Sequence, residues 1–142
     1  MTTTIDVRAD LPAPPAKVYR RLADRSTWPD WSGHSRAEID EPSDQGPAGV
    51  GAVWVMYRGK KCVTERVVEL ECNRRVTYKL LDGLPLTNYR AGFELAPSGS
   101  GTAVHWHSEF TAKPGQGWIY RRALGFFMRR AFTKLGAIAA SE

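Results

Sequence analysis

The sequence predicts an α+β protein in which a seven-stranded antiparallel sheet curves around one long helix at the C-terminal end. Seven segments have the composition or alternation of strands, and the later ones follow each other across short turns, as antiparallel hairpins do. Residues 117–140 instead carry apolar residues at helical spacing. An antiparallel sheet needs cover on one face, and the pattern offers a single long helix to provide it.

The first strand is expected at Thr3–Leu11, where apolar and polar residues alternate. A proline-rich run ends this strand and suits the first turn of a helix, which the spacing of apolar residues predicts over Ala16–Ala23. A second short helix is expected through residues 28–31, with Ser26 or Thr27 as its capping residue.

Six further strands and the long helix follow. Arg36–Asp40 is a short strand candidate, and residues 41–51 form a turn-rich loop. The remaining strands are separated by turns rich in glycine, asparagine, aspartate and proline, and are expected at Ala52–Arg58, Cys62–Glu71, Arg75–Leu81, Tyr89–Ala96 and Thr102–Thr111. The long helix is expected at Gly117–Ala140. Neither a repeat nor a linker divides the chain, so residues 1–142 are expected to form one domain.

The last strand indicates a ligand cavity. One of its two rows consists of Val104, Trp106, Ser108 and Phe110, opposite a polar row. An indole, a phenyl ring and a lone hydroxyl suit a pocket wall better than a close-packed core. A sheet curved around a single helix also leaves space that the side chains of the helix cannot fill. We therefore expect a cavity between the sheet and the long helix.

The polar row of the same strand contains His105, His107 and Glu109, which are residue types that bind zinc or iron. Because they lie opposite the Trp106 row, we expect them on the solvated face, away from the cavity. The chain also has no dinucleotide fingerprint and no phosphate-binding loop followed by a helix. We expect neither a metal nor a cofactor.

Composition is ordinary for a globular domain, with 42% hydrophobic and 25% charged residues and a net charge of +5. The basic residues concentrate on the late helix, where a solvated helix face is the simpler interpretation and an anionic partner the alternative. No apolar run is long enough to span a bilayer and no secretory signal is evident, so we expect the cytoplasm. Cys62 and Cys72 are expected to be free thiols, with Cys62 a candidate to face the pocket.

Several short motifs, taken together, carry a family resemblance. They are WPDW at 28–31, GLP at 83–85, GT-x-V-x-W-x-x-EF at 101–110 and KPG at 113–115. With the order of elements, they resemble the START-like (SRPBCC) superfamily, and most of all its polyketide cyclase/dehydrase group. The resemblance implies the helix-grip fold, a seven-stranded antiparallel sheet wrapped around a long C-terminal helix. This superfamily includes aromatase/cyclases, lipid carriers and hormone receptors, so the resemblance does not select one function.

Four residues are candidates for chemistry. If Glu65 faces water, Thr64 and Arg66 face inward, where a guanidinium can polarise a ketone or enolate. The resemblance implies an arginine on this strand with a hydroxyl two residues before it; an arginine at a strand edge or paired with an acid is the alternative. His34 is a candidate proton shuttle, or else an exposed loop histidine. Tyr78 is a further candidate to donate a hydroxyl.

Ten side chains are candidates to line the cavity. Most are flat or polarizable groups that suit an aromatic or polycyclic ligand, and we expect half of them to touch it. They are Trp31, Trp54, Met56, Tyr89, Phe93, Trp106, Ser108, Phe110, Phe127 and Met128. Plain core packing is the alternative for each.

The sequence leaves two main functions open. In the first, the protein binds a hydrophobic, aromatic or polyketide-like small molecule and guides its cyclisation or dehydration. In the second, the same cavity carries or senses a lipid or metabolite without chemistry. Binding to a membrane or nucleic-acid surface through the basic helix is a third and less favoured hypothesis. We expect a hydrophobic ligand as the partner, neither nucleic acid nor membrane insertion, and a monomer or homodimer.

Overall fold

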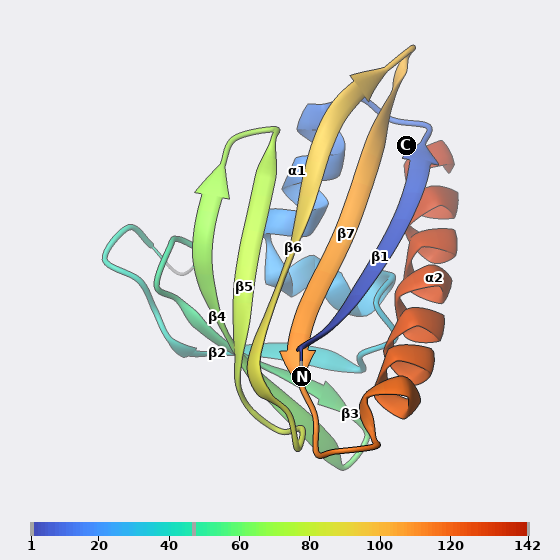
Figure 1. Cartoon of the computed structure of the whole chain (residues 1–142). Coiled ribbons are helices and arrows are strands. Elements are labelled where there is room, and N and C mark those ends of the chain that lie inside the picture. The colour runs from blue at the N-terminus through green and yellow to red at the C-terminus, as the bar shows by residue number, and fades with distance from the viewer. Residues whose placement is uncertain (1, 47, 142) are drawn as a thin grey trace.

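The computed structural model describes residues 2–46 and 48–141, and it has the predicted order of elements (Figure 1). The elements are β1 (Thr2–Leu11), α1 (Pro15–Ala23), the 3₁₀ helix η1 (Arg25–Asp30), β2 (Arg36–Glu41), β3 (Val53–Arg58), β4 (Lys61–Glu71), β5 (Arg75–Asp82), β6 (Thr87–Ser98), β7 (Gly101–Thr111) and α2 (Gly117–Ser141). The loop predicted at 41–51 is largely loop and turn, and its residue Pro47 lies outside the described residues.

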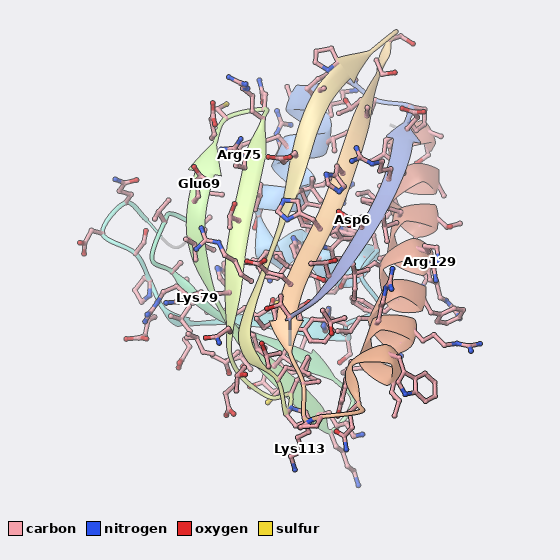
Figure 2. All side chains as sticks on the ribbon, viewed as in Figure 1. Asp6, Glu69, Arg75, Lys79, Lys113 and Arg129 are labelled. Carbon is pink, nitrogen blue, oxygen red and sulfur yellow. The ribbon has the colours of Figure 1, made fainter. Side chains whose placement is uncertain are left out.

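The seven strands form a single sheet in the order β1-β7-β6-β5-β4-β3-β2, and each neighbouring pair is antiparallel. The first strand therefore lies beside the last, and β1 and β2 form the two edges. Polar side chains such as Asp6, Glu69, Arg75 and Lys79 project from the strands in Figure 2. The opposite side chains of the same strands, such as Ile5, are buried. The sheet thus has one wet and one buried face, as its alternation predicts.

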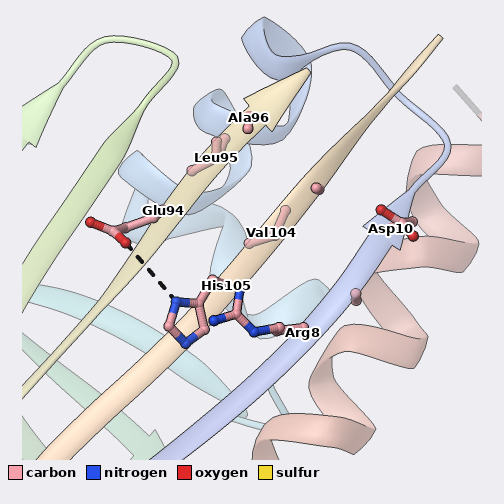
Figure 3. Close-up of a pocket in the computed structure, with 9 residues that line it drawn as sticks. Arg8, Asp10, Glu94, Leu95, Ala96, Val104 and His105 are labelled. Atoms are coloured by element: carbon pink, nitrogen blue, oxygen red, sulfur yellow. Dashed lines mark ion pairs between the residues drawn. The ribbon is translucent and has the colours of Figure 1, made fainter. Parts of the chain in front are cut away.

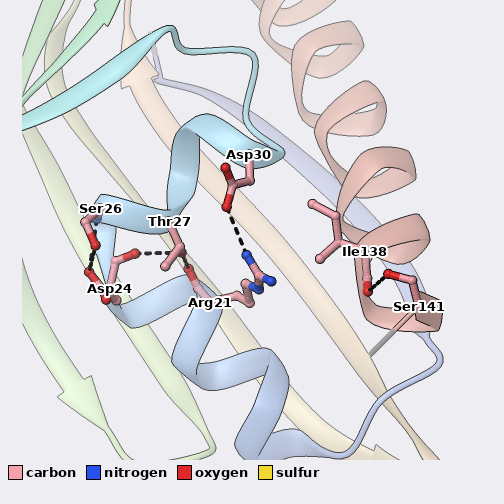
Figure 4. Close-up of polar contacts among 7 residues, drawn as sticks. All are labelled: Arg21, Asp24, Ser26, Thr27, Asp30, Ile138 and Ser141. Atoms are coloured by element: carbon pink, nitrogen blue, oxygen red, sulfur yellow. Dashed lines mark hydrogen bonds and ion pairs between the residues drawn. The ribbon is translucent and has the colours of Figure 1, made fainter.

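Asp24 caps the short helix η1, so the prediction of Ser26 or Thr27 as its cap is wrong. The Asp24 carboxylate accepts hydrogen bonds from the Ser26 backbone N–H at 3.0 Å and from its hydroxyl at 2.6 Å (Figure 4). The Thr27 hydroxyl instead donates to the carbonyl of Arg21 at 2.9 Å. A carboxylate before the helix satisfies an N–H group that the helix itself leaves unpaired. Arg21 also pairs with Asp30 at 3.1 Å, which ties η1 to α1.

The long helix α2 approaches the sheet most closely along β1. Large side chains fill much of the space between α2 and the middle strands, and some of them form an aromatic cluster. Ring centroids lie 5.0 Å apart for Trp28 and Trp31, and 4.5 Å apart for Phe93 and Trp106. All four side chains are almost completely buried. Trp28 and Trp106 of this cluster also line the space that remains between sheet and helix.

None of the helices in the described part of the chain is both long and apolar enough to cross a membrane. Cys62 and Cys72 are free thiols, as predicted, and both are exposed.

Candidate functional site

A cavity of about 320 Å³ lies between the N-terminal half of α2 and the strands β3 to β7. Its sheet side includes Met56, Val63 and Trp106, and its helix side includes Leu124 and Phe127. The lining is mostly apolar and aromatic, which is typical of small-molecule sites. Arg58, Lys61 and Cys62 are lining residues that are also exposed, so they mark the opening to solvent.

Inside the cavity wall lies a carboxylate, that of Glu65, which is only 8% exposed. Arg25 donates a hydrogen bond from Nη1 to Glu65 Oε1 at 2.5 Å, and Arg25 is itself 1% exposed. The guanidinium carbon lies 3.8 Å from the ring centroid of Trp28 and 4.4 Å from that of Tyr78. Aromatic faces attract a cation, so two rings and one acid hold the buried charge.

The orientation predicted for Thr64 and Arg66 is wrong. Arg66 points to the outer face, where it pairs with Glu41 at 3.6 Å and is 40% exposed, and Thr64 lies on the same row outside the cavity lining. The prediction assumed that the carboxylates of Glu65 and Glu69 both face water. Glu69 does face out, but a β-bulge between Val67 and Glu69 shifts the phase of the strand by one residue. On the cavity side of the bulge, the inward row contains Glu65 and Val67.

Two tyrosines line the cavity, Tyr78 from β5 and Tyr89 from β6. The Trp106 indole donates its Nε1–H to the Tyr78 hydroxyl at 3.1 Å, so the Tyr78 proton remains to be donated elsewhere. Burial raises the pKa of Tyr78 well above its usual value, and burial together with Glu65 raises the pKa of Tyr89. Both hydroxyls therefore stay protonated at neutral pH and act as hydrogen-bond donors.

His34 lines the cavity from the loop after η1 and is partly buried. The Ser32 hydroxyl lies 2.8 Å from its Nδ1, and its ring packs edge-on against Phe127 at 5.6 Å. Burial first, and then the charges of Arg25 and Arg58, lower the pKa of His34 to about 4. The imidazole is therefore neutral at physiological pH.

The cavity brings together part of the predicted set. Its lining contains His34, Tyr78, Met56, Tyr89, Trp106, Phe127 and Met128. The other predicted residues lie outside the lining: Arg66, Thr64, Trp31, Trp54, Phe93, Ser108 and Phe110. Among these, Trp31, Phe93 and Phe110 are fully buried and pack behind the cavity wall.

Sequence reasoning missed the acidic and basic members of the site, Glu65, Arg25, Arg58 and Lys61. A signal for Glu65 was present, because Val63 and Val67 flank it on the same row of the strand and both are apolar. Arg25 had no such signal, since its partner is 40 residues away in the chain.

The outer face of the sheet carries a second, shallower groove, formed by the strands β1, β6 and β7 (Figure 3). His105 in this groove lies 4.0 Å from Glu94, and it also lies 2.7 Å from Asp6, which is outside the groove lining. His107 and Glu109 lie on the same face, away from the Trp106 row as predicted. Across residues 2–46 and 48–141, no three histidine, cysteine, aspartate or glutamate side chains are grouped so that they could hold a metal ion.

The fold has many known counterparts. A START superfamily protein from Mycobacterium smegmatis superposes with a TM-score of 0.84 at 14% identity, over 98% of both chains. A structure from Thermobifida fusca gives a TM-score of 0.74 at 26% identity, over 87% of this chain and 83% of that one. The major latex-like protein 151 of Panax ginseng gives 0.76 at 13% identity, over 97% of both chains.

A search of curated proteins finds no match to this chain. The sequence model of one family, described as polyketide cyclase/dehydrase and lipid transport, matches residues 2–139. This match spans nearly the whole chain, and the seven-stranded sheet with its long terminal helix agrees with the START-like neighbours. Such a fold and family are consistent with binding a hydrophobic ligand in the cavity. The chain belongs to the polyketide cyclase/dehydrase and lipid transport family, with the helix-grip fold of the START-like superfamily.

Proposed function

We propose that the protein binds a flat, hydrophobic small molecule that carries a hydroxyl or another hydrogen-bond donor. The observation that carries this proposal is the Glu65 carboxylate, buried in the wall of a cavity of about 320 Å³ that is otherwise mainly apolar. The ligand body lies between α2 and the sheet, and its donor faces Glu65.

The apolar lining supplies most of the binding free energy. Burial of about 200 Å² of apolar ligand surface contributes about 5 kcal/mol, before the cost of association. Trp106, Phe127 and Tyr120 favour a ring system, since flat aromatic groups pack on one another at 4.5–7 Å.

The polar groups set the orientation. Only Oε1 of Glu65 receives the bond from Arg25, and a carboxylate has further acceptor positions. A ligand hydroxyl is therefore the natural partner of Glu65, while the protonated hydroxyls of Tyr78 and Tyr89 donate to a ligand oxygen. A ligand without any donor leaves the carboxylate desolvated and unpaired, which is costly.

Two isosteric probes test this proposal. In fluorescence titrations, 2-naphthol is expected to bind saturably and at least tenfold more tightly than 2-methylnaphthalene, which replaces the hydroxyl with a methyl group. Glu65→Gln is expected to reduce that preference, provided that its circular dichroism shows a folded protein; Tyr89→Phe serves as a second variant. Equal affinity for both probes, or no saturable binding of either, contradicts the proposal.

Cyclisation or dehydration of a polyketone in the same cavity is a second candidate, favoured by the position of Glu65 among hydroxyl donors. Here the carboxylate removes a proton from a carbon between two ketones, and the enolate carbon attacks a third ketone of the same chain. A tyrosine hydroxyl donates a hydrogen bond to the ketone oxygen as negative charge develops there. The alkoxide formed takes up the proton from Glu65, and loss of water follows.

Turnover separates the two candidates. If chemistry occurs, Glu65→Gln retains measurable ligand binding but loses at least a hundredfold in kcat with a short linear polyketone, since general acid–base catalysis contributes about 10²–10⁴-fold. Arg66→Gln is the matched control, because Arg66 lies on the outer face, and it is expected to leave turnover unchanged. Absence of any product with the wild-type protein removes the enzymatic candidate and leaves ligand binding.

A further inference from the structure

The helix α2 carries a charge distribution that its role in the fold does not require. It contains five cationic residues and no acidic one between Gly117 and Ser141. No basic residue lies in its last turn, where the helix dipole would favour one. Two of the cations, Arg121 and Arg122, lie instead in its N-terminal third. Helix stability therefore does not explain the cations of α2.

These cations are exposed and unneutralised. Arg122, Arg129, Arg130 and Lys134 are all exposed, and none forms an ion pair with any residue in the described ranges. The sheet behaves differently, since arginines such as Arg75 pair with neighbouring acids. Figure 2 shows Arg129 on α2, well separated in the view from Glu69 and Lys79.

The same face of α2 exposes large apolar side chains. Trp118 is 64% exposed, Phe126 is 61% exposed and Ile119 is 46% exposed. At 100° per residue, Ile119 and Phe126 lie along the centre of the exposed face. Arg122 and Arg129 flank this apolar line on one side. Arg130 and Lys134 flank it on the other.

We propose that this exposed face of α2 docks on the surface of an anionic lipid bilayer. The apolar line enters the interface between headgroups and acyl chains, and the flanking cations contact lipid phosphates. The dimensions fit, because the face from Trp118 to Lys134 extends about 24 Å along the helix axis. A nucleic acid offers the same negative charge, but it gives an exposed indole and phenyl ring between the arginines no apolar layer to enter.

A groove beside this face supports the same proposal. It has a volume of about 450 Å³ and is lined by Phe126, Arg130, Lys134 and Arg58, among others. Arg58 and Phe127 line both this groove and the internal cavity, so the two hollows adjoin. Docking through α2 therefore brings the cavity opening next to the bilayer, where an apolar ligand can pass between the two without crossing water.

Co-sedimentation of the full chain with vesicles tests the proposal without any cavity ligand. We expect binding to phosphatidylcholine vesicles that contain 30% phosphatidylglycerol and none to phosphatidylcholine alone. Binding is expected to weaken as NaCl rises, since the Debye length falls from about 10 Å at 0.1 M to about 3 Å at 1 M. No binding to either vesicle overturns the proposal, and so does stronger binding to a random-sequence DNA duplex than to the anionic vesicles.

Two charge-matched variants locate the surface. The α2 variant combines four substitutions: Arg122→Gln, Arg129→Gln, Arg130→Gln and Lys134→Gln. The sheet variant also combines four: Arg8→Gln, Arg74→Gln, Lys79→Gln and Arg90→Gln. All eight positions are exposed. Each cation near an anionic surface contributes about fivefold to affinity, so the α2 variant is expected to lose at least about tenfold. The sheet variant keeps wild-type affinity within about threefold. Equal losses in both variants contradict docking through α2.

Trp118 reports the contact directly, because it is exposed while the other four tryptophans, Trp28, Trp31, Trp54 and Trp106, are buried. Acrylamide quenching of the free protein therefore arises mainly from Trp118. Anionic vesicles are expected to reduce this quenching at least twofold. Phe126→Ala, which keeps every charge, is expected to weaken vesicle binding. Vesicle binding with unchanged quenching means that another face docks, which overturns the proposal.

Discussion

Arg25 and Glu65 form a buried ion pair across 40 residues of chain, with Nη1 and Oε1 separated by 2.5 Å. Arg25 comes from η1 and Glu65 from the middle of the sheet, so the pair fastens the short helix to the cavity wall. Nε and Nη2 of Arg25 make no hydrogen bond with the described residues. The Arg25 guanidinium is thus enclosed by aromatic rings, and within residues 2–46 and 48–141 its one counter-charge is Glu65.

Removing one partner is expected to destabilise the protein strongly. Glu65→Ala leaves the Arg25 charge buried without compensation, and we expect a loss of about 3–5 kcal/mol in the free energy of unfolding. Replacing both by apolar residues, Arg25→Met with Glu65→Leu, is expected to restore most of that loss. Urea denaturation of the single and double variants measures both values, and additive losses would show that the two residues are not coupled.

The hydrogen bond between Trp106 and Tyr78 makes a second prediction. Tyr78→Phe removes the acceptor of a buried indole N–H, so we expect the free energy of unfolding to fall by about 1–3 kcal/mol. Tyr57→Phe is the matched control, since Tyr57 is only partly buried on the outer row of β3. Urea denaturation checks the difference, and equal effects of the two substitutions would contradict the account of the bond.

His34 makes stability depend on pH. The pKa of its imidazole is about 4 in the folded protein, against about 6.5 in an unfolded chain. The unfolded chain therefore takes up this proton first, and stability falls as the pH is lowered from about 6.5 to about 4, with no further contribution below that range. The loss is on the order of 3 kcal/mol.

His34→Gln isolates that contribution. Stability of the variant is expected to change less than that of the wild type between pH 7 and pH 4.5, and the difference between the two curves gives the His34 term. NMR titration of the imidazole measures the pKa itself. A value near 6.5 would mean that the ring is solvated and has no part in the cavity wall.

Gly83, in the turn after β5, is expected to tolerate no side chain. Its φ is +115°, and a Cβ there would lie 2.5 Å from the carbonyl oxygen of Cys62, which also lines the cavity. We expect Gly83→Ala to lower the free energy of unfolding by at least about 2 kcal/mol. Gly99→Ala is the control, because its φ is +58° but open space surrounds it, so only the backbone cost of about 1 kcal/mol applies. Comparable values for the two would contradict the close contact.

The element order was predictable because local patterns in the sequence indicate each strand and helix. These patterns are the alternation of apolar and polar residues, the turn residues and the helical spacing of apolar residues. The aromatic and apolar lining followed from the same patterns, as with Trp106 and Phe127. The charged part of the site was predictable only in part, because the apolar neighbours Val63 and Val67 are a local sign that Glu65 faces inward, whereas Arg25 has no such sign. A bulge beside Val67 inverts the row of β4, which turns Glu65 inward and Arg66 outward. A bulge leaves little trace in the pattern of a single strand.

Filling the cavity tests the central claim most directly. Val63→Trp places an indole in the cavity wall, whereas Leu81→Trp adds the same group at a position that is 42% exposed. We expect the Kd for 2-naphthol, measured by fluorescence titration, to rise at least tenfold in Val63→Trp and to stay within twofold of wild type in Leu81→Trp. Unchanged affinity in a folded Val63→Trp protein would contradict a ligand site between the sheet and α2.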